Sequence, residues 1–174
     1  MRELDETEHN KIWDAFEEKF AFHPSVSTFP GIIEPQKSIT FQFSHTYTNA
    51  LQSRLRRRNL GNFIHTRADA LIDELASAVI DSFREVGAVS DEIFRLNWGH
   101  ASYAYNLAEC PLGAGFPDGD YEILLSEDMS FGTFGHPWEH SICIFGDQLV
   151  KSFLKRRPTI LFAVIRNSGG YNVA

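Results

Sequence analysis

The chain has 174 residues, of which 43% are hydrophobic and 22% are charged, a composition typical of one globular domain and not of a disordered protein. Its formal net charge of −7 argues against general nucleic-acid binding, which requires neutralised phosphates, and favours basic partners. No apolar run reaches the roughly 20 residues of a membrane span and the acidic N-terminus shows no secretory signal, so we expect a cytoplasmic protein without membrane contact.

The first half of the chain combines helix-like segments with one strand. Apolar residues recur at helical spacing over Thr7–Phe20, which predicts the first helix. Ile39–Phe43 alternates apolar and polar residues and is predicted as a strand. A short helix is expected over Tyr47–Leu60, and a longer one over Thr66–Val86, where a capping-box-like start precedes the apolar stripe and Gly87 follows the end.

The second half of the chain is richer in strands. Strand-like runs cover 92–98, 101–107, 121–126, 130–134 and 141–145, and the first two flank the short Gly99-His100 connection of a hairpin. Asp147 is expected to cap a helix through Arg157 that Pro158 ends. For Thr159–Ile165 the pattern is consistent with either a strand or a buried helix.

These elements predict a fold class and a layout. Consecutive strands with short connections favour an antiparallel sheet. We therefore expect a single α+β domain over residues 1–174, with a mostly antiparallel sheet and helices packed on one face. Its N-terminal helical part covers about 1–87, its β-rich part about 92–146 and its C-terminal helix about 147–157.

Residues 136–140, His-Pro-Trp-Glu-His, formally match the HxxEH motif of inverted zinc proteases. That chemistry needs both histidines one helical turn apart and a third ligand from downstream. Glu139 is the last glutamate of the chain, and the following Ser141–Ile144 looks like a strand. We therefore expect a tight turn that places Trp138 against the sheet, with a ligand-recognising loop as the alternative, and we expect neither a metal nor a cofactor.

Three further features have structural explanations. Pro117-Asp118-Gly119-Asp120 is predicted as a turn, in which aspartate accepts backbone hydrogen bonds and glycine supplies a positive φ. The basic residues Arg54, Arg56, Arg57 and Arg58 fall in the last turns of a predicted helix, where cations complement the dipole. Cys143 lies in an apolar strand and should be inert, whereas Cys110, in a loop, is the more reactive thiol.

Several sequence motifs resemble one known family. The combination PDGDY, GTFGHPWE and ICIFG between residues 117 and 146 resembles the bacterial family catalogued as domain of unknown function 2716. The Phe22-His23-Pro24-Ser25 segment and the hairpin Asn97-Trp98-Gly99-His100 are similar to further landmarks of that family. The resemblance implies a small single bacterial domain and indicates where its shared surface lies, but it implies no reaction.

Two functional hypotheses follow from the sequence. The first is a cytoplasmic, non-catalytic protein-interaction module with an unidentified protein partner, similar to an immunity protein or antitoxin, because negative charge speeds association with basic partners. The alternative is a small-molecule-binding protein or hydrolase-type enzyme in which His136 is the acid–base residue and Asp118 or Asp120 its partner. The candidate ligand or partner site comprises Trp98, His100, Tyr103, Asp118, Asp120, His136, Trp138 and Glu139.

Overall fold

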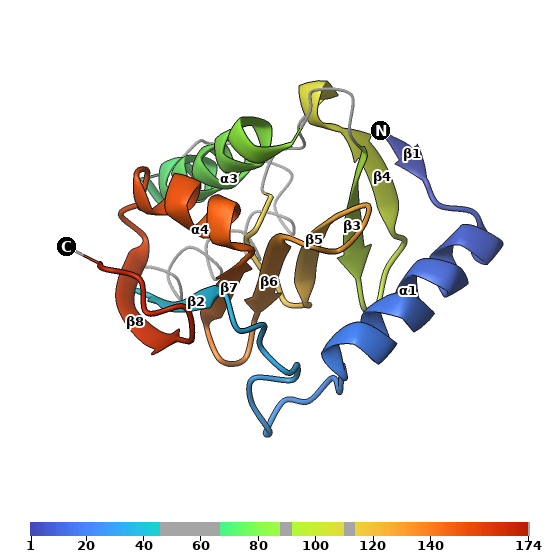
Figure 1. Cartoon of the computed structure of the whole chain (residues 1–174), viewed down its shortest axis with the longest axis horizontal. Helices are drawn as coiled ribbons and strands as arrows, with labels where there is room; N and C mark the ends of the chain where they lie inside the picture. The colour runs from blue at the N-terminus through green and yellow to red at the C-terminus, as the bar shows by residue number, and fades with distance from the viewer. Residues whose placement is uncertain (46–66, 88–91, 110–113, 174) are drawn as a thin grey trace.

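The computed structural model describes residues 1–45, 67–87, 92–109 and 114–173, and its central feature is an eight-stranded sheet (Figure 1). The strand order is β1-β4-β3-β5-β6-β7-β2-β8, and every neighbouring pair is antiparallel. The strands are β1 (Arg2–Glu3), β2 (Ser38–Phe43), β3 (Glu92–Asn97), β4 (Tyr103–Asn106), β5 (Glu122–Ser126), β6 (Gly132–His136), β7 (Ser141–Phe145) and β8 (Leu161–Asn167). The helices are α1 (Glu6–Phe20), α3 (Arg67–Val86), the short 3₁₀ turn η1 (Leu107–Glu109) and α4 (Asp147–Leu154).

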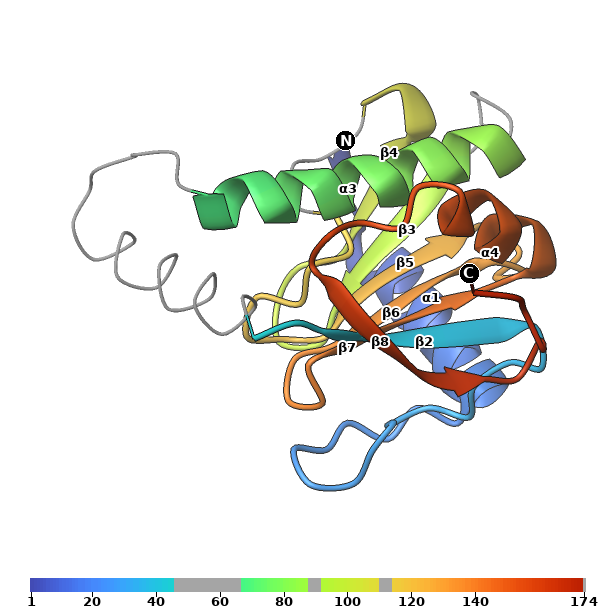
Figure 2. The same ribbon diagram turned by 90° about the vertical axis from the view of Figure 1, so that its left-hand side faces the viewer.

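Both faces of the sheet are buried, because alternate residues of its central strands enter two separate cores. On one face Phe41 and Ile142 join a core with α3 and α4. On the other face Phe145 packs against Phe20 of α1, with ring centroids 5.2 Å apart. Figure 2 shows α3 and α1 on opposite sides of the sheet. The predicted single α+β domain with an antiparallel sheet is confirmed, but the expectation that all helices cover one face is wrong.

Helix α1 illustrates how local sequence specifies an element. Asp5 accepts a hydrogen bond from the Glu8 backbone N–H, and the Glu8 side chain accepts one from the Asp5 backbone N–H, which completes a capping box. Trp13, Phe16 and Phe20 then form the buried stripe that the helical spacing predicted. The helix carries this stripe onto the sheet face opposite α3 because β1 places its start beside β4.

In the C-terminal region the structure shows whether residues 159–165 form a strand or a helix, and it corrects the predicted cap of α4. Leu161–Asn167 forms β8, which pairs with β2, so the apolar segment is a strand and not a buried helix. Asp147 is not the cap of α4: the N-cap is Gly146, and the Asp147 carboxylate accepts hydrogen bonds from Lys151 and Tyr171. The predicted helix Tyr47–Leu60 and its arginine run, with Cys110, lie outside the described residues.

Gly132 of β6 is required by close packing of the neighbouring strands. A Cβ atom at this position would lie 2.3 Å from the Leu124 carbonyl oxygen and 2.7 Å from the Phe145 ring. We expect Gly132→Ala to lower the free energy of unfolding by about 2 kcal/mol, because backbone of an adjacent strand cannot move aside locally. Chemical denaturation measures the loss. Gly99→Ala, whose Cβ would meet only the Asp120 carboxylate at 3.4 Å, is the matched control and should stay within about 0.5 kcal/mol.

Among the helices in the described parts of the chain, none combines the length and the apolar character needed to cross a membrane.

Candidate functional site

Tyr121 is the centre of a polar and aromatic cluster at one end of the sheet. Its ring is fully buried, and its hydroxyl donates to the Ser25 carbonyl oxygen and accepts from the Ser25 backbone N–H, both at 2.7 Å. Asp120 fixes the backbone beside it, since its carboxylate accepts from the N–H of Tyr121 and from the N–H of Gly99, each at 2.7 Å. Tyr121 therefore joins the loop after α1 to the start of β5, and Asp120 joins that strand to the β3–β4 hairpin.

Three exposed rings surround this centre, and each comes from a different segment. Trp98 of the β3–β4 hairpin and Trp138 of the β6–β7 turn contact the Tyr121 ring at centroid distances of 6.2 and 5.2 Å. Phe29, in the loop after α1, packs edge-on against His136 at 4.5 Å. Trp98 is 54% exposed, Phe29 40% and Trp138 36%. We call Phe29, Trp98 and Trp138 the aromatic surface.

His136, the last residue of β6, is buried under this surface and is held in its neutral form. Its Nδ1 accepts a hydrogen bond of 3.0 Å from the Glu139 backbone N–H, so this nitrogen carries no proton. Its Nε2 lies 3.4 Å from the Tyr121 hydroxyl. Burial lowers the pKa of His136 to about 4, although the nearby Glu139 carboxylate acts in the opposite direction. At neutral pH the imidazole is therefore an uncharged structural link between the turn and Tyr121.

Arg166 of β8 fixes the β6–β7 turn from the other side. Its Nη1 and Nη2 donate to the two carboxylate oxygens of Glu139 at 2.7 and 2.6 Å, and its Nε donates to Glu34 at 2.7 Å. Ser141 also donates to Glu139, and Thr40 donates to Glu34. Both carboxylates are largely buried, with 13% and 12% of their side chains exposed, so a bidentate arginine is the partner that stabilises them there.

The structure brings some of the predicted site residues together and separates others. Trp98, Asp120, His136, Trp138 and Glu139 lie around Tyr121 in the contacts given above. Tyr103 packs against the core on the α3 face, the opposite side of the sheet from His136. His100 and Asp118 are exposed in their turns. The ring nitrogens of His136 face Glu139 N–H and the Tyr121 hydroxyl, not the carboxylates of residues 118 and 120.

The HxxEH match does not form the helix that its chemistry requires. His136 ends β6, whereas His140 lies in the turn with a left-handed φ of 54°. The two histidines are therefore not presented one helical turn apart. In the part of the chain that the structure describes, no group of three His, Cys, Asp or Glu residues could hold a metal ion.

Sequence reasoning missed five residues that build the site. Tyr121 and Ser25 were part of the quoted motifs PDGDY and FHPS, but their mutual hydrogen bonds span 96 positions and leave no local signal. Phe29 lies in a loop with irregular backbone. Arg166 and Glu34, which meet across 132 positions, carry no motif at all.

Two buried ionisable side chains lie close to the site on the sheet. Glu122 follows Tyr121 on β5 and forms an ion pair with Arg95 of β3, with Nε and Oε1 2.8 Å apart. Burial raises the pKa of Glu122 to about 7, and the attraction of Arg95 opposes that rise. Cys143 of β7 is also buried, which raises the pKa of its thiol to about 12 and leaves it unreactive, as the sequence predicted.

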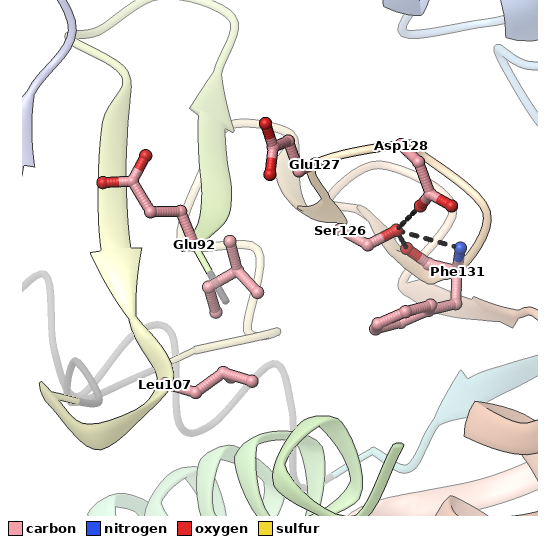
Figure 3. A pocket seen from close by; sticks show the side chains of 7 residues that line it. Glu92, Leu107, Ser126, Glu127, Asp128 and Phe131 are labelled. Atoms are coloured by element: carbon pink, nitrogen blue, oxygen red, sulfur yellow. Dashed lines mark hydrogen bonds between the residues drawn. The ribbon is translucent and has the colours of Figure 1, made fainter. Parts of the chain in front are cut away.

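A separate cavity of about 480 Å³ lies at another part of the sheet. It is lined by Glu92, Ile93, Leu107, Ser126, Glu127, Asp128 and Phe131, none of which was predicted as a site residue. Figure 3 shows Ser126 Oγ hydrogen-bonded to the Asp128 carboxylate and to the backbone of Phe131. Asp128 also accepts from the Ser130 N–H, and Glu92 pairs with Arg2 at 3.3 Å. Two of its three carboxylates thus already have partners within the fold.

Comparison with known proteins identifies relatives over most of the chain. The model of a family described as protein of unknown function (DUF2716) matches residues 3–150, which include Tyr121 and His136 but not Arg166. The uncharacterized protein YxiI of Bacillus subtilis (strain 168) is 25% identical over 170 residues, covering 92% of this chain and 96% of that protein. No solved structure is significantly similar. Because the family match extends over more than half of its length, the chain belongs to the DUF2716 family.

Proposed function

We propose that the chain is an intracellular protein-interaction module that binds a basic protein partner through the aromatic surface, in the manner of an immunity protein or antitoxin. One observation carries this proposal. Three rings from three separate segments remain 36 to 54% exposed while they pack against the buried Tyr121 and His136. Large exposed aromatic residues held rigidly by a buried framework are typical of protein-binding hot spots.

The supporting framework reduces the entropic cost of binding. Trp138 lies in a turn fixed by the Arg166–Glu139 ion pair and the His136–Glu139 hydrogen bond. Phe29 lies in the loop that Ser25 attaches to Tyr121. Because these side chains are ordered before any partner arrives, less conformational freedom is lost on association.

The charge of the chain supports a basic partner. The formal net charge is −7, and such a field accelerates the encounter with positively charged proteins. Binding should therefore weaken with rising salt, because screening at 0.15 M already shortens the reach of exposed charges to about 8 Å.

The geometry gives less support to catalysis by His136. An acid–base histidine needs a ring nitrogen within reach of substrate and a pKa near the working pH. Both ring nitrogens of His136 are directed at Glu139 N–H and Tyr121, and its pKa is lowered to about 4. We therefore assign His136 a structural role in positioning the aromatic surface.

Tryptophan variants test the proposal. We expect a protein captured by the wild-type chain from native-host extract to bind Trp98→Ala and Trp138→Ala at least about 30-fold more weakly, since truncating a hot-spot residue costs about 2 kcal/mol or more. Isothermal titration calorimetry with the purified partner measures the change. Phe162→Ala is the matched control: Phe162 is 66% exposed on edge strand β8, separated from β6 by β7 and β2. Equal affinities for all three variants, or no captured protein, would contradict the proposal.

A further inference from the structure

Trp98 and Asp120 lie on two turns that touch. The N–H of Gly99, the residue after Trp98, donates to Asp120 Oδ2 at 2.7 Å. Tyr121, the residue after Asp120, meets the Trp98 indole at a centroid distance of 6.2 Å and an interplanar angle of 79°. An edge-to-face contact of this kind leaves much of the indole uncovered, and Trp98 is 54% exposed. A half-buried carboxylate and an exposed indole are thus held on neighbouring turns, through Gly99 and Tyr121.

Asp120 has no cationic partner among the described residues. Its hydrogen-bond donors there are the backbone N–H groups of Gly99 and Tyr121, which are dipoles and not charges. The more deeply buried carboxylates, in contrast to Asp120, each have a cationic partner: Glu122 pairs with Arg95, and Glu139 and Glu34 both pair with Arg166. Each Asp120 oxygen accepts one of these two bonds and retains a second lone pair for a donor from outside.

A guanidinium group fits this combination better than an ammonium group. Its planar face stacks on an indole, and its edge donates two parallel hydrogen bonds to a carboxylate. The lysine ammonium is a compact, strongly hydrated charge that lacks both the stacking face and the fork of donors. Arginine is also enriched among the hot-spot residues of protein interfaces, where it pairs with hot spots of the partner.

We propose that Trp98 and Asp120 form the receptor for an arginine side chain of the protein partner, with the guanidinium stacked on the indole and bonded to the carboxylate. This assignment rests on the proposed function, because it names the partner group that the aromatic surface recognises. In this arrangement Trp138 and Phe29 contact apolar groups around that arginine, and Trp98 with Asp120 supplies the selection for charge.

The test uses N-acetyl-arginine amide as the probe and the full chain as the receptor. We expect ¹⁵N NMR titration at constant ionic strength to give saturable shifts of the Trp98 indole N–H and of the Gly99 and Tyr121 amides. N-acetyl-lysine amide should bind at least threefold more weakly. Asp120→Asn and Trp98→Ala should each abolish saturation, whereas Phe162→Ala, on the edge strand β8, should retain it. The Asn side chain keeps an acceptor for the turn, and unchanged distant amide shifts would confirm that the variants are folded.

Equal binding of the arginine and lysine probes, or saturation that survives Asp120→Asn, would overturn the arginine assignment. The two proposals fail in different experiments. If the arginine probe binds as expected but a captured partner binds Trp98→Ala and Trp138→Ala as tightly as the wild type, the proposed interaction function is wrong. If the partner needs both tryptophans but the probes are not discriminated, only the arginine assignment fails.

Discussion

Replacing Arg166 with methionine should lower the free energy of unfolding by about 3 kcal/mol at pH 7, because it leaves two largely buried carboxylates without their cation. The guanidinium is the shared partner of Glu34 and Glu139, at 2.7 and 2.6 Å. Methionine restores the volume but neither the charge nor the hydrogen bonds. Urea denaturation measures the loss. Lys151→Met, which breaks the exposed Lys151–Asp147 pair, is the matched control and should change stability by less than about 0.5 kcal/mol.

The effect of Arg166→Met should shrink as the pH falls. In the wild-type chain burial opposes the charged form of Glu139, but its bonds to Arg166 and Ser141 prevail and lower its pKa. That stabilisation is present above the unfolded pKa of 4.5 and is lost as the pH falls through the folded value. Without Arg166 the buried Glu139 carboxylate takes up a proton more readily. At acidic pH the variant therefore loses less stability relative to the wild type. A loss that is the same at pH 7 and pH 4 would contradict this account.

The stability of the wild-type chain should decrease toward acidic pH because His136 is held neutral in the folded state. Its pKa is about 4 in the folded chain and 6.5 in the unfolded chain. Between these values the unfolded state binds a proton that the folded state does not, so stability falls as the pH decreases from 6.5 to about 4. The shift corresponds to about 3 kcal/mol. His136→Asn removes this titration and retains a side-chain acceptor near the position of Nδ1.

Glu122 changes the stability with pH in the opposite direction to His136, over an overlapping pH range. Because its pKa is raised from 4.5 to about 7, the folded state binds the extra proton, and its contribution falls as the pH rises through that interval. The wild-type curve therefore combines both groups. The difference between wild type and His136→Asn, measured by denaturation from pH 4 to pH 7, isolates the histidine. Parallel curves for the two proteins would show that His136 is not held neutral.

Arg166 also connects stability to the proposed function. It fixes Glu139, whose backbone N–H bonds to His136 and whose neighbour Trp138 belongs to the aromatic surface. Arg166 touches no partner group in the proposal, so it is a positioning residue. Its replacement should weaken partner binding less than Trp138→Ala does, because the indole remains present but is less ordered.

Local sequence patterns determined most elements of this protein. The spacing of Trp13, Phe16 and Phe20 identified α1, since helical periodicity is a short-range property. Alternation identified β2, and the turn glycines separated the later strands. The scarcity of carboxylates after Glu139 and the strand-like residues that follow it also argued against a zinc-protease site.

Only the tertiary structure decided how these elements are layered and where the site lies. Strands β5 and β7 place apolar side chains on both faces of the sheet, so α1 can pack on the face opposite α3. Which helix covers which face depends on the strand order and not on any one segment. The Tyr121–Ser25 and Arg166–Glu34 contacts join residues 96 and 132 positions apart. Sequence periodicity reports only on residues a few positions apart. These contacts arise instead from the register of the sheet, so they exist only in the folded chain.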